Sequence, residues 1–173
     1  MLYSIRAEQT EDICAIKEVN DLAFGREDES SLIEAIRSSE HFVPQLSLVA
    51  ETSAGEVVGH ILFSKIGIET EGGFVTSLAL APMAVKPDYQ QRGIGSDLVR
   101  EGLGRCAEAG YGSVIVLGHP QFYPKFGFIP ASEKKLQGPF DVQDQYFMVC
   151  ETQIGSLSGV EGMVRYPEAF FNV

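Results

Sequence analysis

The stretch VKPDYQQRGIGSDLV, residues 85–99, decides how this chain is interpreted. An apolar run ends at Lys-Pro-Asp, and a helical pattern then begins at Gly93-Ile94-Gly95 without a capping side chain. The first N–H groups of a helix have no intrahelical acceptor, and together with the helix dipole they attract anions. Residues 90–95 therefore predict an anion-binding turn, and a pyrophosphate suits its geometry.

The spacing of this turn, Q-x-x-G-x-G, differs from the common phosphate-binding motifs. It lacks the Gly-Lys-Ser/Thr of a Walker loop and the third glycine of the dinucleotide motif. Glycine lets the backbone approach a ligand closely, but two glycines also fit an ordinary turn. Arg92 and Lys86 could add positive charge at the rim.

The segment before the turn, FVTSLALAPMAV (residues 74–85), is an apolar strand interrupted by Pro82. Proline has no N–H for a sheet ladder, so it indicates a bulge or an edge. A strand that bends there separates from its neighbour and leaves backbone groups unpaired beside the turn. An extended ligand arm can add to such an edge by main-chain hydrogen bonds. A pyrophosphate that continues into a strand-like arm describes coenzyme A.

The hydrophobic pattern predicts an α/β fold with a mixed sheet and helices on both faces. The early strands can pair antiparallel, whereas the strand–helix–strand unit of residues 76–118 requires a parallel pair with a right-handed crossover. Thr10 is the expected cap of the first helix. Strand patterns cover residues 2–7, 46–52, 56–69, 74–85, 112–118 and 145–151; helical patterns cover 10–25, 28–40 and 96–110, with a short helical turn at 120–128.

The amino-acid composition limits which molecules the protein is expected to bind. The chain has 13 basic and 24 acidic residues, a net charge of −11, which argues against nucleic acid. The first 70 residues hold 13 acids and 5 bases, which fits a cationic substrate or a solubilising surface. Three isolated cysteines indicate a reducing compartment and no metal site. No apolar run reaches the roughly 20 residues of a membrane helix and no signal-peptide pattern is present, so we expect a cytoplasmic protein without a membrane partner.

Residues 83–95, MAVKPDYQQRGIG, resemble the acyl-CoA signature of the GCN5-related N-acetyltransferases, the GNAT family. The blocks FGREDESSLIEAIR, VVGHILFS, LALAPMAVKPDYQQRGIG, VLGHPQFYPKFGF and GMVRYPEAFF are similar, in this order, to a bacterial subgroup of the family. The resemblance spans roughly residues 1–170. It implies the GNAT fold, a mixed sheet splayed at a bulge in the fourth strand, in a single N-acetyltransferase domain, 1–173. Its parts would be an acceptor side (1–70), an acyl-CoA-binding core (75–130) and a C-terminal strand and tail (145–173).

The resemblance also implies a reaction, the transfer of an acetyl group from acetyl-CoA to an amine. Tyr123 matches the tyrosine that faces the CoA sulfur as general acid, and a phenol with a pKa near 10 is protonated at neutral pH. The alternative is that its ring only packs among neighbouring phenylalanines. The residues assigned to the cofactor are Met83, Ala84 and Val85 for the arm and an oxyanion contact, Gln90, Gln91, Arg92, Gly93, Ile94, Gly95 and Ser96 for the pyrophosphate, and Phe126.

No residue is a firm general base. His60, in a strand pattern, is either a core histidine or a base that acts through water. His119 lies at the end of a parallel strand, where the family often has aspartate, and it could merely cap the turn. Glu27 and Glu29 lie where family members shape the acceptor pocket, although a solvated loop explains them equally well. Water can also carry the proton.

Three functions compete on the sequence alone. The first is an acetyl-CoA-dependent N-acetyltransferase for a small-molecule or peptide amine. The second is an acyl-CoA binding or sensing module without turnover, and the third is a nucleotide-binding protein that uses the same glycine turn. The chain is expected to act as a monomer or homodimer, and the apolar tail AFFNV could dock on the domain or on a second subunit.

Overall fold

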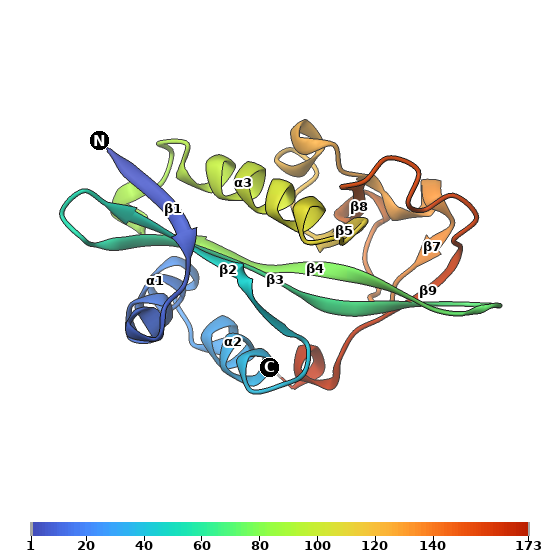
Figure 1. The fold of residues 1–173 in the computed structure, drawn as a ribbon, viewed down its shortest axis with the longest axis horizontal. Helices are drawn as coiled ribbons and strands as arrows, with labels where there is room; N and C mark the ends of the chain where they lie inside the picture. Colours follow the sequence, from blue (N-terminus) through green and yellow to red (C-terminus); the bar gives the residue numbers. More distant parts are fainter. Residues whose placement is uncertain (1, 173) are drawn as a thin grey trace.

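The computed structural model describes residues 2–172 and contains one mixed β-sheet (Figure 1). Its main path runs β1-β2-β3-β4-β5-β8-β6, and β9 joins β3 to β7. The pairs β1–β2, β2–β3 and β3–β4 are antiparallel and β4–β5 is parallel, as predicted. The strands are β1 (Tyr3–Ala7), β2 (Phe42–Thr52), β3 (Val57–Thr70), β4 (Gly73–Val85), β5 (Ser113–Leu117), β6 (Ile129–Pro130), β7 (Leu136–Gln137), β8 (Phe147–Glu151) and β9 (Gly162–Arg165).

Helices cover both faces of the sheet, which confirms the predicted layering. Figure 1 shows α3 (Ile94–Glu108) on one side and α1 (Ile13–Phe24) and α2 (Asp28–Arg37) on the other. Under α3, Leu98 and Val99 are buried with Phe63 of β3, and a Cβ on Gly102 would lie 2.3 Å from the Phe63 ring. Under α1 and α2, Ile16 and Ile33 pack on the opposite face. Each such side chain contributes about 1.5–3 kcal/mol of burial free energy.

The first helix begins differently from the prediction. Thr10 does not cap it: residues Thr10–Asp12 form a 3-10 turn, and α1 starts at Ile13. The Asp12 carboxylate accepts a hydrogen bond from the N–H of Gln9 at 2.7 Å and pairs with Arg6. A carboxylate that makes both contacts holds the chain more firmly than a threonine hydroxyl does. The helix ends as expected at Gly25, whose φ of 69° is in the left-handed region.

The fourth strand is irregular at Pro82, as predicted. Ile61 of β3 pairs with Met83, but Phe63, two residues on, pairs with Leu80, three residues back, so β4 carries one extra residue there. On its other edge β4 pairs with β5 only at Leu78 and Ala79. The two strands therefore separate before the bulge, and the last six residues of β4 have β3 as their only strand neighbour among residues 2–172.

The C-terminal segment was not predicted in this form. β9 pairs with the second half of β3, beyond the part that β2 occupies, and a Cβ on Gly162 would lie 1.9 Å from the carbonyl oxygen of Glu69. The 3-10 turn Glu168–Phe171 follows, and its Ala169 and Phe170 pack against the core under α1 and α2. The apolar tail thus docks on its own chain. None of the helices among residues 2–172 is long and apolar enough to cross a membrane.

Candidate active site

The glycine turn forms a curved row of backbone N–H groups at the start of α3. Gln91 (φ 63°) and Gly93 (φ 88°) both have left-handed conformations, and Gly93 is the N-cap without a side-chain hydrogen bond. Within the part of the chain that the structure describes, no protein atom accepts a hydrogen bond from the N–H groups of residues 91–96. The first partnered N–H is that of Asp97, which donates to the carbonyl of Gly93 at 3.0 Å. Six consecutive N–H groups without a protein acceptor, at the start of a helix, are the donors that the predicted anion-binding turn requires.

The turn is held against β4 by its own side chains. The Gln90 amide donates to the carbonyl of Val85 at 2.9 Å, and the N–H of Lys86 donates to Val58 of β3 at 2.9 Å. Gly95 lies close to Met83, because a Cβ there would be 3.4 Å from the Met83 sulfur. Gln90 therefore positions the turn, and its carboxamide nitrogen is already engaged.

The two cations expected at the rim differ in their surroundings. Lys86 is not free: its Nζ lies 3.2 Å from Glu56 and 3.8 Å from Glu18, so it ties the end of β4 to α1. Arg92 stacks over the ring of Tyr89, 5.5 Å from its centroid. Arg92 thus keeps its positive charge at the turn, whereas the charge of Lys86 is compensated.

Along the end of β4, the backbone N–H and C=O groups of successive residues point alternately toward β3 and toward the open edge. The N–H of Lys86 bonds to Val58, so Val85 and Gly59 form a non-hydrogen-bonded pair, and the N–H and C=O of Val85 point away from β3. By the same alternation, the backbone N–H and C=O of Met83 face the open side, and those of Ala84 face β3. The backbone of Met83 and the N–H of Val85 can therefore offer hydrogen bonds to an extended ligand, whereas the Val85 carbonyl already accepts from Gln90 and Ala84 packs its methyl group under α1.

Tyr123 follows β5, the strand that separates from β4 before the bulge. It starts the 3-10 turn Tyr123–Phe126 after β5, and its ring makes edge contacts with Phe122 and Phe128. Its exposed fraction is 8%, and its hydroxyl has no hydrogen-bond partner among residues 2–172. Burial raises the pKa of Tyr123 to about 12. The phenol is therefore fixed in place, protonated and available as a donor.

The ring of Tyr123 depends on a glycine. A Cβ on Gly118 would lie 2.4 Å from Cε2 of Tyr123, and Gly118 donates its N–H to Tyr146 at 2.9 Å. Only a residue without a side chain lets the ring lie over the end of β5.

Gly118→Ala is expected to displace the Tyr123 ring, to lower stability by about 1–3 kcal/mol, and to reduce turnover. The matched control is Gly104→Ala, because a Cβ at Gly104 of α3 meets nothing within 4 Å. The control should gain up to about 1 kcal/mol of helix stability. Urea unfolding and a thiol-release assay measure both effects, and a Gly118→Ala protein as stable and active as the control would contradict this view of the ring.

His119 and Phe126 lie on either side of Tyr123 in sequence. The His119 carbonyl accepts hydrogen bonds from the N–H groups of Phe122 and Tyr123, at 3.1 and 3.3 Å, while its side chain is exposed. The backbone of His119 therefore shapes the turn. Phe126 packs against the core under α3, and Arg100 and Lys125 lie over its ring.

His60 is a core histidine with both ring nitrogens engaged. Its Nδ1 accepts from the Asn20 amide at 3.3 Å, and its Nε2 donates to Ser47 at 3.1 Å; Ser47 in turn donates to Glu8, which pairs with Arg37 at 3.0 Å. Burial, and secondarily the charge of Arg37, lowers the pKa of His60 to about 3. A base acting through water does not fit a side chain that has no exposed surface.

The neutral state of His60 predicts acid sensitivity. His60 has its ordinary pKa of 6.5 in the unfolded chain and a pKa of about 3 in the folded chain. Between these pH values it is protonated in the unfolded chain and neutral in the folded chain. The contribution of His60 to the free energy of unfolding is therefore fully present above pH 6.5, and it falls by about 1.4 kcal/mol per pH unit below that value. When the pH is lowered from 7 to 5, the free energy of unfolding, measured in urea, should fall in the His60→Gln variant by about 2 kcal/mol less than it falls in the parent. A control, the surface variant His41→Gln, should follow the parent; equal losses for all three would contradict the assignment.

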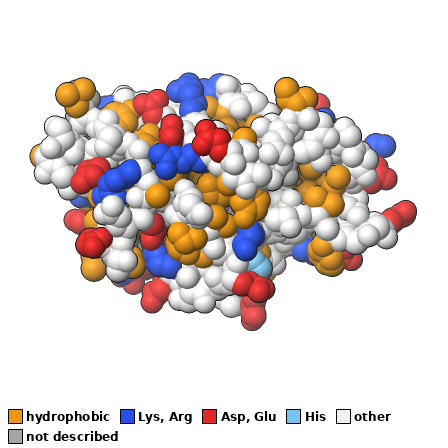
Figure 2. Space-filling model, in the orientation of Figure 1, with side chains coloured by type: hydrophobic (Ala, Val, Ile, Leu, Met, Phe, Trp, Pro, Cys, Tyr) orange, Lys and Arg blue, Asp and Glu red, His pale blue; other side chains and the backbone are white. Residues whose placement is uncertain are grey.

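The acidic residues near the first loop are paired. Both Glu29 oxygens contact the Arg26 guanidinium, at 2.6 and 3.0 Å, and Glu27 lies 3.2 Å from Lys17. Figure 2 shows acidic and basic side chains interspersed over the visible face. Glu29 is therefore not a free carboxylate, although the 13 acids of the first 70 residues still outnumber the 5 bases there.

The remaining candidate groups are inert or lie elsewhere. Burial raises the pKa of Cys106 to about 12 and also raises that of Cys150, so neither thiol is reactive. Among residues 2–172, no three His, Cys, Asp or Glu side chains are grouped to hold a metal ion.

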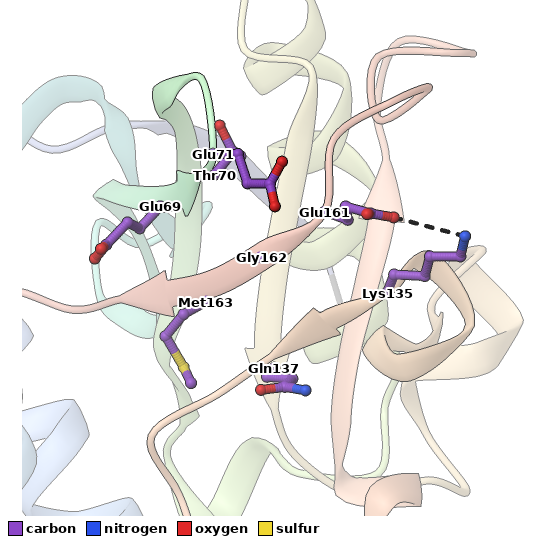
Figure 3. Close-up of a pocket in the computed structure, with 8 residues that line it drawn as sticks. All are labelled: Glu69, Thr70, Glu71, Lys135, Gln137, Glu161, Gly162 and Met163. Carbon is purple, nitrogen blue, oxygen red and sulfur yellow. Dashed lines mark ion pairs between the residues drawn. The ribbon is translucent and has the colours of Figure 1, made fainter.

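A hollow of about 620 Å³ lies at the far end of β4 from the glycine turn. Figure 3 shows that Lys135 and Glu161 pair across its rim, at 3.6 Å. Glu69, another residue of its lining, pairs at 2.8 Å with Arg165, which does not line the hollow. The hollow lies at the Gly73 end of β4, whereas the glycine turn follows Val85 at its other end, so the hollow is no part of the candidate site.

Comparison with known proteins agrees with this geometry. The profile of the acetyltransferase (GNAT) domain matches residues 40–130, which include β4, the turn, α3 and Tyr123. The chain belongs to the GNAT acetyltransferase family. It is similar to the N-acetyltransferase YjhQ of Escherichia coli K12, with 34% identity over 83% of this chain and 80% of that protein.

Two solved GNAT structures cover nearly the whole chain. YhbS from Escherichia coli, solved in complex with CoA, has a TM-score of 0.90 at 31% identity, over 98% of this chain and 92% of that one. A GNAT acetyltransferase from Brucella melitensis, solved with acetyl-CoA, has a TM-score of 0.80 at 31% identity, over 98% of both chains. Both structures confirm the GNAT fold predicted from the sequence.

Proposed function

We propose that this GNAT protein transfers an acetyl group from acetyl-CoA to a primary amine of a small molecule or peptide. One observation carries the proposal. The six N–H groups of residues 91–96 have no protein acceptor, and they follow the end of β4, where β5 no longer pairs with it. The complexes of the two similar proteins with CoA and acetyl-CoA support the same cofactor here.

The residues fit the cofactor at both of its polar parts. The N–H row with the dipole of α3 would hold the diphosphate, and Arg92 adds a positive charge. Met83 and Val85 would hydrogen-bond the amide-containing arm as a neighbouring strand does. The acetyl group is supplied as a thioester, which an uncharged amine can attack.

Three chain groups would assist the transfer. A β4 N–H, that of Met83 or Val85, can donate to the carbonyl oxygen as negative charge develops on it, and such a donor is worth about 3 kcal/mol. Tyr123, kept protonated by burial, can donate its hydroxyl proton toward the departing sulfur. His60 is buried and Glu29 is paired, so the proton of the amine would pass to water or to the exposed side chain of His119.

The acceptor side is proposed to lie with residues 1–70, on the face that carries α1 and α2. Some of its acidic side chains are paired with Arg6, Lys17, Arg26 and Arg37. The remaining excess of acids over bases in residues 1–70 would favour a cationic amine over a neutral one.

The test is release of free thiol from acetyl-CoA with a panel of primary amines, alongside calorimetry with acetyl-CoA. Binding with amine-dependent thiol release supports the proposal. Tight binding without turnover on any amine would instead favour an acyl-CoA binding module, and binding of ATP or NAD in place of acetyl-CoA would favour a nucleotide-binding protein.

A further inference from the structure

Two cations share one aromatic ring beside the glycine turn. The guanidinium of Arg100, on α3, lies 5.2 Å from the centroid of Phe126, and the Lys125 ammonium lies 5.1 Å from the same centroid and 4.5 Å from that of Phe122. The negative face of an aromatic ring attracts a cation, by about 0.5–1 kcal/mol at exposed sites. The rings thus hold together two like charges that would otherwise repel each other.

Of these two cations, Lys125 has no carboxylate partner among residues 2–172, in a protein of net charge −11, and Arg100 has one, Asp97. Ten of its 13 basic residues have a carboxylate oxygen within 4.0 Å; within residues 2–172 only Lys65, Arg92 and Lys125 have none. The carboxylate nearest to Arg100 is that of Asp97, at 3.6 Å, and it already accepts a hydrogen bond from Tyr3. Two of the three uncompensated cations therefore lie next to the proposed cofactor slot.

Helix α3 sets the position of Arg100 relative to the glycine turn. Arg100 is six residues beyond Ile94, about 9 Å along the helix axis, and long side chains on a helix lean toward its N-terminus. Lys125 comes from the turn that also carries Tyr123, on the other side of the opening. The two basic groups meet at Phe126 within reach of a ligand that starts on residues 91–96.

Coenzyme A carries a second anionic group close to its diphosphate. One ribose carries the diphosphate on its 5′ oxygen and a phosphate monoester on its 3′ oxygen. A guanidinium binds a phosphate through two parallel N–H bonds, and an ammonium adds a point charge. We propose that Arg100 and Lys125, held on the ring of Phe126, bind the 3′-phosphate of coenzyme A and distinguish it from 3′-dephospho-coenzyme A. This inference rests on the proposed function, because it requires the diphosphate to lie on residues 91–96.

Calorimetry with two ligands, CoA and 3′-dephospho-CoA, tests the inference without any turnover. The parent should bind CoA at least about tenfold more tightly than dephospho-CoA. The double variant Arg100→Gln/Lys125→Gln should reduce this ratio below about threefold, with the affinity for dephospho-CoA unchanged. Added salt should reduce the ratio in the parent and leave it constant in the double variant.

The control is Lys65→Gln, which removes an uncompensated cation from β3 and should keep the ratio of the parent. Both altered residues are exposed, and equal melting temperatures check that the double variant is folded. A parent that binds the two ligands equally, or a double variant with the ratio of the parent, would overturn the inference while leaving the proposed function standing. A parent that binds neither ligand would overturn the proposed function and the inference with it.

Discussion

Ser96→Asp is expected to raise the melting temperature of the protein and to weaken its binding of CoA at least about 100-fold. Ser96 is the third residue of α3, in the turn where a carboxylate stabilises a helix by about 0.3–1 kcal/mol through the dipole. The same carboxylate would take up N–H groups of residues 91–96 and repel the diphosphate. Stability and cofactor affinity should therefore change in opposite directions.

Ser96→Asn separates charge from shape in this experiment. Asparagine has nearly the size of aspartate but no charge, so it should weaken binding far less than aspartate does. Thermal melts and calorimetry with CoA measure the two effects. An Asp variant that binds CoA like the parent would show that the diphosphate does not lie on these N–H groups.

Tyr123→Phe should lower kcat by about 10²–10⁴ and leave the affinity for acetyl-CoA within about threefold of the parent. Phenylalanine keeps the ring contacts with Phe122 and Phe128 and removes only the hydroxyl, which has no partner among the described residues. Because the pKa of Tyr123 is raised to about 12, the rate of the parent should not fall through loss of this proton below about pH 10.

The control for Tyr123→Phe is Tyr166→Phe. Tyr166 is also a tyrosine whose pKa burial raises, but it packs with Phe140 and Phe170 in the C-terminal aromatic cluster. Its loss of a hydroxyl should leave kcat unchanged. Equal kinetics for Tyr123→Phe and the parent would remove the general-acid role.

The fold near the cofactor slot could be predicted because its signals are local. Pro82 interrupts one apolar strand, and the glycines stand where α3 begins, so a short sequence window contains both the bulge and the helix start. Pairing of the early strands also followed from short connections, such as the turn at Gly55 between β2 and β3. These features depend on few residues and on backbone conformation.

Features that several distant elements share could not be predicted. His60 is held by Asn20, Ser47 and Glu8, from α1, β2 and the segment after β1, and no spacing in the sequence indicates that chain of contacts. Lys86 is adjacent to the glycine turn in sequence, but its side chain crosses to Glu18 of α1. The position of β9 on β3 requires Gly162 to touch the carbonyl of Glu69, a contact between residues far apart in the chain.

Backbone N–H chemical shifts of the ¹⁵N-labelled protein, recorded while acetyl-CoA is added, test the central claim most directly. We expect the signals of residues 91–96, together with those of Met83 and Val85, to shift and to saturate at one ligand per chain. Asp97, which already donates to Gly93, should shift much less than its neighbours. Shifts that leave residues 91–96 unchanged and gather instead around Glu69 and Glu161 would contradict that claim.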